Sequence, residues 1–329
     1  MSAPATPAPE RTHPPSGGDG GRPARAAWRS RLTQLDITYT PYLLIAPFFI
    51  LFGAFGLFPL IFNVVVSLRH WRLDDPSGDG WGGFDNYRRI LDDSDMWHAL
   101  WNTLGLFVLS TIPQLVVGLL LANLLNRKLR MQTFLRMGVL LPYITPIAAS
   151  TLVFGSIFAP DTGLINLIIK DFGGTPRELR ADVWSSWLGV ITMVNWRWTG
   201  YWTVIFLAAM QSIPRDLYEA ATVDGAAAWA QFRRITLPLL RPAIMFSVVV
   251  STIGGLQLFT EPLLFDDVPT NASGGSAHQF QTVMMYIYKV AYKDLNMGAA
   301  AAIAVGLVVV TLLITTLNAW LTRWIGGRT

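Results

Sequence analysis

The chain has 329 residues, of which 52% are hydrophobic and only 14% are charged, whereas charged residues make up roughly 25% of an average soluble protein. It contains no cysteine, which excludes a disulfide framework and any thiolate metal site or nucleophile. The net charge of +4 does not come from a basic stripe of the kind that binds nucleic acid, so we expect no nucleic-acid partner. The composition is instead typical of a membrane protein.

The N-terminal segment, residues 1–40, is rich in Pro, Gly, Ala and Arg and has few side chains to bury. Such a composition predicts a disordered tail. The apolar stretch that follows is too long for the core of a signal peptide, so we expect it to stay in the membrane. Residues 41–325 are predicted to form one membrane domain.

Six apolar segments follow the tail. A helix needs about 20 such residues to cross the hydrocarbon core, because its backbone polar groups must be satisfied within the segment. The six segments are 43–67, 99–126, 137–160, 183–214, 242–260 and 295–322, and Arg197 is the only Asp, Glu, Lys or Arg inside them. Prolines such as Pro113, Pro142 and Pro146 are tolerated in membrane helices and mark expected kinks. The predicted fold is an all-α, polytopic membrane protein with six transmembrane helices.

The distribution of basic residues predicts the orientation, since Lys and Arg in short loops stay in the cytoplasm. Basic residues outnumber acidic ones in the tail, in segments 127–136 and 215–241 and at the C-terminus. Acidic residues outnumber basic ones in the loops between 68 and 95, 161 and 182, and 261 and 294. Both termini are therefore expected in the cytoplasm, which agrees with an even number of spans.

No catalytic, metal or cofactor site is predicted. A phosphate-binding loop ends in Gly-Lys-Ser or Gly-Lys-Thr, and none of the four lysines follows a glycine. The four histidines do not have the spacing of metal ligands. We therefore expect no enzyme activity, and any energy from ATP must reach this chain from a partner.

Residues 212–238, between the fourth and fifth predicted spans, are predicted to form a helix–turn–helix hairpin on the cytoplasmic side. Pro214 supplies a helix start signal, and Asp224 and Gly225 end the first helix, because glycine enters the left-handed conformation without a steric penalty. A second short helix follows, which the Leu-Pro pair at 237–238 is expected to close. With one apolar and one polar face, such a hairpin is suited to dock against another protein.

The same hairpin resembles a known family. Its pattern of Glu-Ala-Ala, three residues, Gly, nine residues and Ile-x-Leu-Pro is similar to the EAA motif of ABC importer permeases, and it matches at every defining position. The resemblance, which covers residues 40–325, implies the type I ABC importer permease fold and a coupling hairpin (residues 212–238) that docks on a separate ATPase. The residues that it assigns to ATPase docking are Glu219, Ala220, Ala221, Asp224, Gly225, Ile235, Leu237 and Pro238.

Residues 84–87, 97–100, 102–103 and 141–143 are similar to permeases of the carbohydrate branch, and residues 195–201 and 254–257 look most like subunits for cellobiose and related oligosaccharides. The resemblance implies a permease for small sugars that works by alternating access in the plasma (inner) membrane of a bacterium. ATP and Mg²⁺ would be bound by the partner ATPase, and this chain would hold no cofactor. The implied partners are a second, related permease subunit, a dimer of ABC ATPases, an extracytoplasmic sugar-binding lipoprotein and membrane lipid. The extra spans and large external domain of the maltose permease are absent here, so its sugar contacts do not transfer by position.

Polar and aromatic residues in the fourth and fifth spans are the candidates for the substrate pathway. A cation within a span costs roughly 2.5–3.5 kcal/mol, so Arg197 is expected either to face an interior cavity or to lie near the outer interface and pair with Glu261. Aromatic rings pack against sugars but also form interfacial belts. Gln257 and Glu261, expected on one face of the fifth span, suit either sugar hydroxyls or contacts between helices. The candidate residues are Asn195, Trp196, Arg197, Trp198, Tyr201, Gln257 and Glu261.

Other functions are also compatible with parts of the sequence. An ABC importer permease for a non-sugar solute, such as glycerol phosphate, would carry the same hairpin. A secondary transporter would show two similar halves with buried proton or sodium ligands, and a membrane-embedded enzyme would need paired acidic or histidine residues at the membrane surface. The sequence shows neither pattern.

Overall fold

The computed structural model describes residues 40–127, 130–160, 162–266 and 271–326. These residues form helices and two isolated β-bridges, with no strand among them. The chain divides into two compact units, Met1–Ile61 and Phe62–Thr329. The predicted tail lies outside the described residues except for Thr40, and its disorder stays a prediction.

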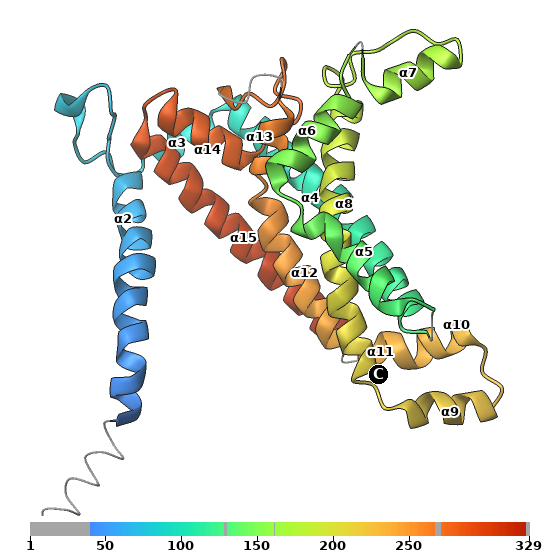
Figure 1. Cartoon of the computed structure of the whole chain (residues 1–329). Helices are drawn as coiled ribbons and strands as arrows, with labels where there is room; N and C mark the ends of the chain where they lie inside the picture. The colour runs from blue at the N-terminus through green and yellow to red at the C-terminus, as the bar shows by residue number, and fades with distance from the viewer. Residues whose placement is uncertain (1–39, 128–129, 161, 267–270, 327–329) are drawn as a thin grey trace, which may run out of the picture. The chain divides into compact units, whose positions relative to one another are not determined.

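The first helical stretch, Thr40–Ser67, is 28 residues long and apolar enough to cross a membrane. It contains one π-helical turn, η1 (Gly53–Leu57), and continues as α2 (Phe58–Ser67) (Figure 1). Its large apolar side chains before residue 61 are exposed, and Phe48 and Phe52 stack with ring centroids 6.1 Å apart. A surface this apolar suits lipid or another membrane helix.

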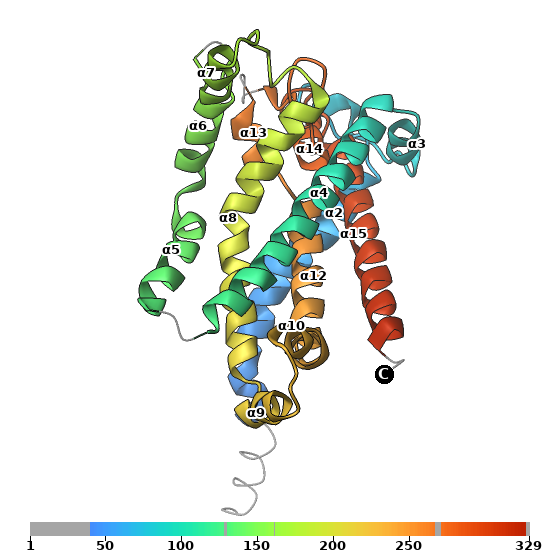
Figure 2. The ribbon, with the colours of Figure 1, turned by 90° about the vertical axis from the view of Figure 1, so that its right-hand side faces the viewer.

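The centre of the second unit is the pair α4 (Ser94–Leu125) and α8 (Val183–Gln211), which run side by side (Figures 1 and 2). Small and polar residues of α4 are buried at this contact. A Cβ atom at Gly118 would lie 3.2 Å from Cβ of Trp202 and 3.4 Å from the carbonyl oxygen of Thr199. Small residues let membrane helices approach closely, so the two backbones pack without intervening side chains here.

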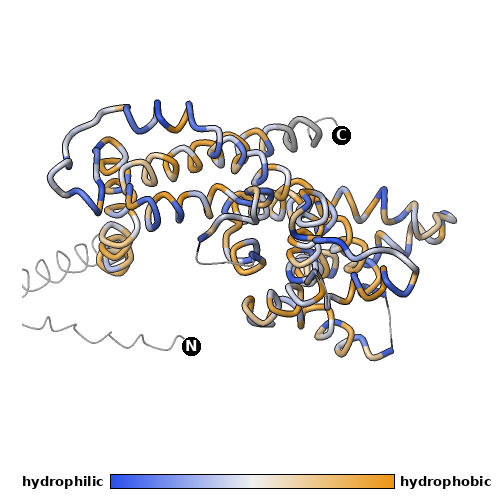
Figure 3. Tube along the Cα trace, turned by 90° about the horizontal axis from the view of Figure 1, so that it is seen from above, coloured by the Kyte–Doolittle hydropathy of each residue, from blue (hydrophilic) through white to orange (hydrophobic). Residues whose placement is uncertain are grey.

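Two further long helices, α12 (Arg241–Leu256) and α15 (Met297–Gly326), pack against each other, and α12 also contacts α4. Orange stretches of hydrophobic residues follow the long helices in Figure 3. The short helices lie at the two ends of this group (Figures 1 and 2). The helices α7 (Leu164–Asp171), α13 (Thr260–Phe265) and α14 (Val283–Tyr292) lie at one end, and α9 (Arg215–Val223) and α10 (Ala228–Gln231) at the other. The remaining short elements are η2 (Pro76–Gly78) and α3 (Asp85–Leu91).

A tyrosine fixes α14 to the start of α4. The hydroxyl of Tyr286 donates a hydrogen bond to Asp93, whose other carboxylate oxygen accepts from the amide of Asp95, 2.9 Å away, in the first turn of α4. Burial and the Asp93 carboxylate raise the pKa of Tyr286 above its usual value. The tyrosine therefore remains a donor at any physiological pH.

The predicted span at 137–160 is broken. It consists of α5 (Gln132–Ile144) and α6 (Ile147–Ile157), which meet at an angle of 87°. Thr145 and Pro146 both have extended backbone, because the proline ring disfavours helical conformation of the preceding residue and supplies no N–H. The expected kink at Pro146 is therefore a full break, whereas Pro113 and Pro142 remain inside helices.

The predicted span at 242–260 also differs from the structure. Its helix α12 ends at Leu256, Gln257 leaves helical conformation, and α13 begins at Thr260. The prediction that Gln257 and Glu261 share one helical face is therefore wrong. Two adjacent glycines, at 254 and 255, precede the end of the helix, and glycine is among the weakest helix formers.

Three described helical stretches are long and apolar enough to cross a membrane: Thr40–Ser67, Ser94–Leu125 and Met297–Trp320. Two bent pairs, Gln132–Ile144 with Ile147–Ile157 and Ala228–Leu239 with Arg241–Leu256, raise this number to up to five. Helix α8 is not among them, since Asn195, Arg197 and several tryptophans lower its mean hydropathy. A sixth span therefore depends on α8, and the count of six stays a prediction.

The contact between α5 and α8 provides a test of this packing. A Cβ atom at Gly200 would overlap the carbonyl oxygen of Val139, and a backbone atom cannot rotate away. We expect Gly200→Ala to destabilise the protein by roughly 1–3 kcal/mol, measured as a lower unfolding temperature of the purified protein in detergent. Gly138→Ala is the matched control, because a Cβ there has open space. Equal unfolding temperatures for the two variants would contradict the close contact.

Candidate functional site

The structure contains the predicted hairpin. Helix α9 begins after Pro214 and ends at Asp224, and Gly225 follows with φ of +77°. The amide of Gly225 donates to the carbonyl of Thr222 at 3.0 Å, and the amide of Ala226 donates to that of Ala221 at 2.9 Å. This is the Schellman pattern of helix ends. Glycine takes this conformation without strain, so the sequence fixes where the chain turns.

The second arm of the hairpin is a continuous helical stretch from Ala228 to Leu239. It runs as α10, a π-helical turn η3 (Phe232–Thr236) and α11 (Leu237–Leu239), and it meets α12 at an angle of 67°. The arm ends at Leu239, one residue after the Leu-Pro pair at 237–238 that was expected to close it. Pro238 lies in the first turn of α11, where its missing N–H is not needed.

Hydrogen bonds hold the two arms together. The hydroxyls of Tyr218 and Thr236 are 2.8 Å apart, and the side-chain amide of Gln231 donates to the hydroxyl of Thr222 at 3.0 Å. At the base of the hairpin, Phe232 is buried in a hydrophobic cluster that includes Ile213 and residues of α8. The hairpin is thus a firm unit attached to the ends of the long helices.

The outer surface of the hairpin is uncovered. Val223 is 88% exposed and Trp229 65%, and Glu219 has no ion pair among the described residues. Of the other predicted docking residues, Ala220, Asp224 and Gly225 are exposed, and Ala221, Ile235, Leu237 and Pro238 are half-buried. Exposed apolar side chains beside an unpaired carboxylate are typical of a surface that binds another protein.

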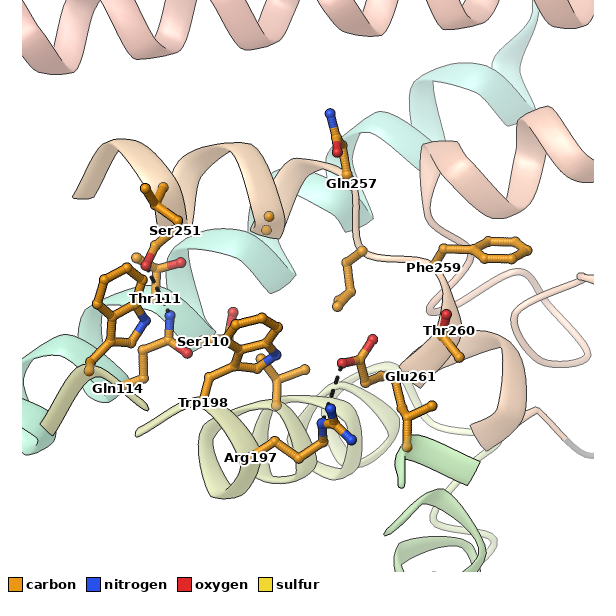
Figure 4. A pocket seen from close by; sticks show the side chains of 17 residues that line it. Ser110, Thr111, Gln114, Arg197, Trp198, Ser251, Gln257, Phe259, Thr260 and Glu261 are labelled. Carbon is orange, nitrogen blue, oxygen red and sulfur yellow. Dashed lines mark hydrogen bonds and ion pairs between the residues drawn. The ribbon is translucent and has the colours of Figure 1, made fainter. Parts of the chain in front are cut away.

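A cavity of about 360 Å³ lies between the long helices (Figure 4). Helix α4 contributes Ser110, Thr111 and Gln114, α8 contributes Arg197 and Trp198, and α12 contributes Ser251. Gln257 and Glu261 line it from the segment after α12. Several of these side chains offer hydroxyl or amide groups, so a cluster of polar groups faces a cavity whose remaining lining is apolar.

Arg197 is the buried cation of this cavity. Its Nη1 donates to the carbonyl oxygen of Thr145 at 3.1 Å, and its Nε lies 4.0 Å from Oε1 of Glu261 (Figure 4). The side chains of Arg197 and Glu261 are only 10% and 8% exposed. Thr145 caps the C-terminus of α5, where the helix dipole favours a cation, and Glu261 lies in the first turn of α13, where it favours an anion. Arg197 therefore lines an interior cavity and also pairs with Glu261, while its position relative to the outer interface stays a prediction.

The cavity contains four of the seven predicted pathway residues: Arg197, Trp198, Gln257 and Glu261. The other three lie outside its lining. Asn195 donates to the carbonyl of Ile191 within α8, Trp196 packs against Phe154, and Tyr201 packs against Tyr143. A role in the pathway for any of the seven stays a prediction.

Sequence reasoning missed the polar contribution of α4. Gln114 follows Ser110 by four residues and Thr111 by three, on one helical face of an otherwise apolar segment, and this spacing was a usable signal. Gln114 donates to the hydroxyl of Ser251 at 3.4 Å, while its Oε1 atom has no hydrogen-bond partner among the described residues. That oxygen can accept a hydrogen bond from a ligand.

Comparison with known proteins identifies the class. The chain belongs to the family of binding-protein-dependent transport system inner membrane components, whose model matches residues 114–327. It is therefore a membrane transport component and not an enzyme. The resemblance inferred from the hairpin is confirmed.

Individual relatives agree with this class. The chain is 34% identical to the lactose transport system permease LacF of Rhizobium radiobacter, over 79% of this chain and 86% of that protein. It is 32% identical to the arabinooligosaccharide transport system permease AraP of Halalkalibacterium halodurans, over 86% of this chain and 87% of that protein. A permease chain of a bacterial alginate ABC transporter has the same fold, with a TM-score of 0.76, 23% identity, and coverage of 89% of this chain and 97% of that chain. The predicted all-α permease fold is confirmed.

The buried ion pair is testable by a double-mutant cycle. Arg197→Met and Glu261→Gln should each destabilise the protein by roughly 3–5 kcal/mol, because each leaves a buried charged group without its partner. The double variant should be less destabilised than the sum of the two, measured by thermal unfolding in detergent. Strictly additive effects would mean that the two side chains do not interact.

Proposed function

We propose that this chain is a permease subunit of an ATP-driven importer of small sugars or oligosaccharides in the bacterial plasma membrane, with both termini in the cytoplasm. The observation that carries the proposal is the coupling hairpin. Its arms are fixed to each other by the Tyr218–Thr236 hydrogen bond, while its outer surface has no cover in this chain. A rigid element with a free docking surface is what a mechanical link to a motor requires.

The motor would be a dimer of ABC ATPases, which bind ATP and Mg²⁺. Glu219 is exposed on α9 and without an ion pair among the described residues, so it is available to pair with a basic residue of the ATPase. The exposed side chains of Val223 and Trp229 add apolar area to such a contact. Closure of the ATPases would then move the hairpin, and the helices attached to its base would follow.

The polar groups that face the cavity beside Arg197 support a neutral, hydroxyl-rich substrate. Hydroxyl and amide groups at Ser110, Thr111 and Gln114 can exchange hydrogen bonds with sugar hydroxyls, and Trp198 offers a ring face. The charge of Arg197 is matched by Glu261, so this part of the chain offers no uncompensated cation to an anion. This balance favours sugars over glycerol phosphate. The names of LacF and AraP point to sugars as well, and cellobiose-like disaccharides remain our first candidate.

The remaining partners follow from the class of importer. The exposed apolar side chains between residues 42 and 61 suit a second permease subunit, which we propose is a relative of this chain rather than a copy. An extracytoplasmic sugar-binding lipoprotein would deliver the sugar at the end of the molecule that carries α13 and α14. Both ends of the pathway would then be served by separate chains.

The coupling hairpin gives the decisive experiment. Glu219→Lys should abolish sugar uptake by cells and reduce the amount of ATPase that co-purifies, because the reversed charge repels the basic partner. Asp171→Lys is the matched control, since it reverses the same charge on an exposed side chain of α7, at the opposite end of the long helices. This control should retain both sugar uptake and the amount of ATPase that co-purifies.

Two results would contradict the proposal. Normal uptake and normal ATPase recovery with Glu219→Lys would remove Glu219 from the docking contact. Uptake that persists without the ATPase and stops with an uncoupler would identify a secondary transporter instead.

A further inference from the structure

A second polar cavity, of about 650 Å³, lies beside the base of the coupling hairpin. It is separate from the cavity that Arg197 lines and shares no lining residue with it. Its walls come from the end of α4, the start of α5, the end of α8 and the first two turns of α9. The lining residues are Asn126, Arg127, Gln132, Arg136, Met210, Gln211, Ile213, Arg215, Tyr218 and Glu219.

The cavity is strongly basic. Arg127, Arg136 and Arg215 contribute three positive charges, against the single carboxylate of Glu219. Among the described residues none of the three guanidinium groups forms an ion pair, and the buried Nε of Arg136 has no hydrogen-bond partner. Like charges gathered around one cavity repel each other. An anion that entered the cavity would relieve this repulsion and supply the missing hydrogen-bond acceptor.

An apolar surface adjoins the basic one. Met131, Phe134 and Met137 expose large side chains along the first turns of α5, three residues apart and so on neighbouring positions of the helix. Helix α5 begins a bent pair that is apolar enough to cross a membrane, so its first turns lie where the chain enters the lipid. A free phosphate ion would use only the arginines. A phospholipid would use both surfaces, with its headgroup at the arginines and its acyl chains along α5.

We propose that this cavity binds the phosphate headgroup of an anionic membrane phospholipid. Arg127 and Arg136 hold the phosphate, and Arg215 connects it to α9. Because the cavity is bounded by both α5 and α9, the bound headgroup braces the coupling hairpin against the membrane helices. The inference rests on the proposed function for one point, namely that the hairpin faces the cytoplasm, where anionic lipids attract basic residues.

The test uses the full chain, purified and placed in lipid nanodiscs. Native mass spectrometry would compare bound phosphatidylglycerol with bound phosphatidylcholine of identical acyl chains. We expect Arg127→Gln/Arg136→Gln to lower the preference for phosphatidylglycerol by roughly tenfold or more. The matched control is Arg233→Gln/Arg234→Gln, which removes the same charge from exposed positions of the hairpin outside the cavity and should keep the preference. Lysine in place of glutamine at position 136, in Arg127→Gln/Arg136→Lys, restores one cation to the double variant. It should recover part of the binding if the charge, and not the fold, is responsible.

Each other outcome would overturn the proposal. An equal loss of the phosphatidylglycerol preference in the two double variants would mean that anionic lipid is attracted to the basic surface in general. No preference in the unmodified protein would mean that the cavity is not a lipid site. Displacement of the lipid by inorganic phosphate at millimolar concentration would identify free phosphate as the ligand. Recovery of the ATPase with Glu219→Lys is scored separately, so failure of the docking proposal and failure of the lipid proposal are distinguishable.

Discussion

The left-handed turn at Gly225 is the constraint on which this account depends. It reverses the chain between the two arms of the hairpin. The hydrogen bond between the hydroxyls of Tyr218 and Thr236, 2.8 Å apart, then holds the arms together. Phe232 is buried at the base beside Ile213 and residues of α8, so the hairpin is packed against the ends of the long helices. A flexible loop in this place would not transmit a displacement to the long helices. The geometry therefore supports the proposed transmission of force from a separate motor.

A second constraint comes from the membrane, where a backbone carbonyl without a partner is costly. The break between α5 and α6 frees the carbonyl of Thr145, and Arg197 donates a hydrogen bond to it while pairing with Glu261. One buried cation thus connects three elements, α8, the α5–α6 break and α13. The polar groups of the adjoining cavity are available to a ligand because the charges beside them are already matched. This balance is the basis of the proposed preference for a neutral solute.

The sequence predicted the class of protein because its strongest signals are local. Long apolar segments, basic loops and the Glu-Ala-Ala motif with Gly225 do not depend on tertiary contacts, and the family and fold they indicated are confirmed. The break at Pro146 was predicted only as a kink, and the shared face of Gln257 and Glu261 was wrong, because helix ends depend on packing around them. The polar face of α4 was missed since Ser110 and Gln114 gain meaning only when α8 and α12 bring Arg197 and Ser251 beside them. The basic cavity likewise gathers arginines from the loop after α4 and from helices α5 and α9.

The chain has no cysteine, so a single introduced cysteine reports one position without background. Val223, at the end of α9, is 88% exposed, and Val223→Cys with a short bifunctional crosslinker measures directly what the hairpin touches. The account predicts a crosslink to the ATPase subunit in membranes of cells that express the whole transporter, and no labelling of intact cells by a membrane-impermeant maleimide. Labelling from outside, with no crosslink to the ATPase, would contradict it.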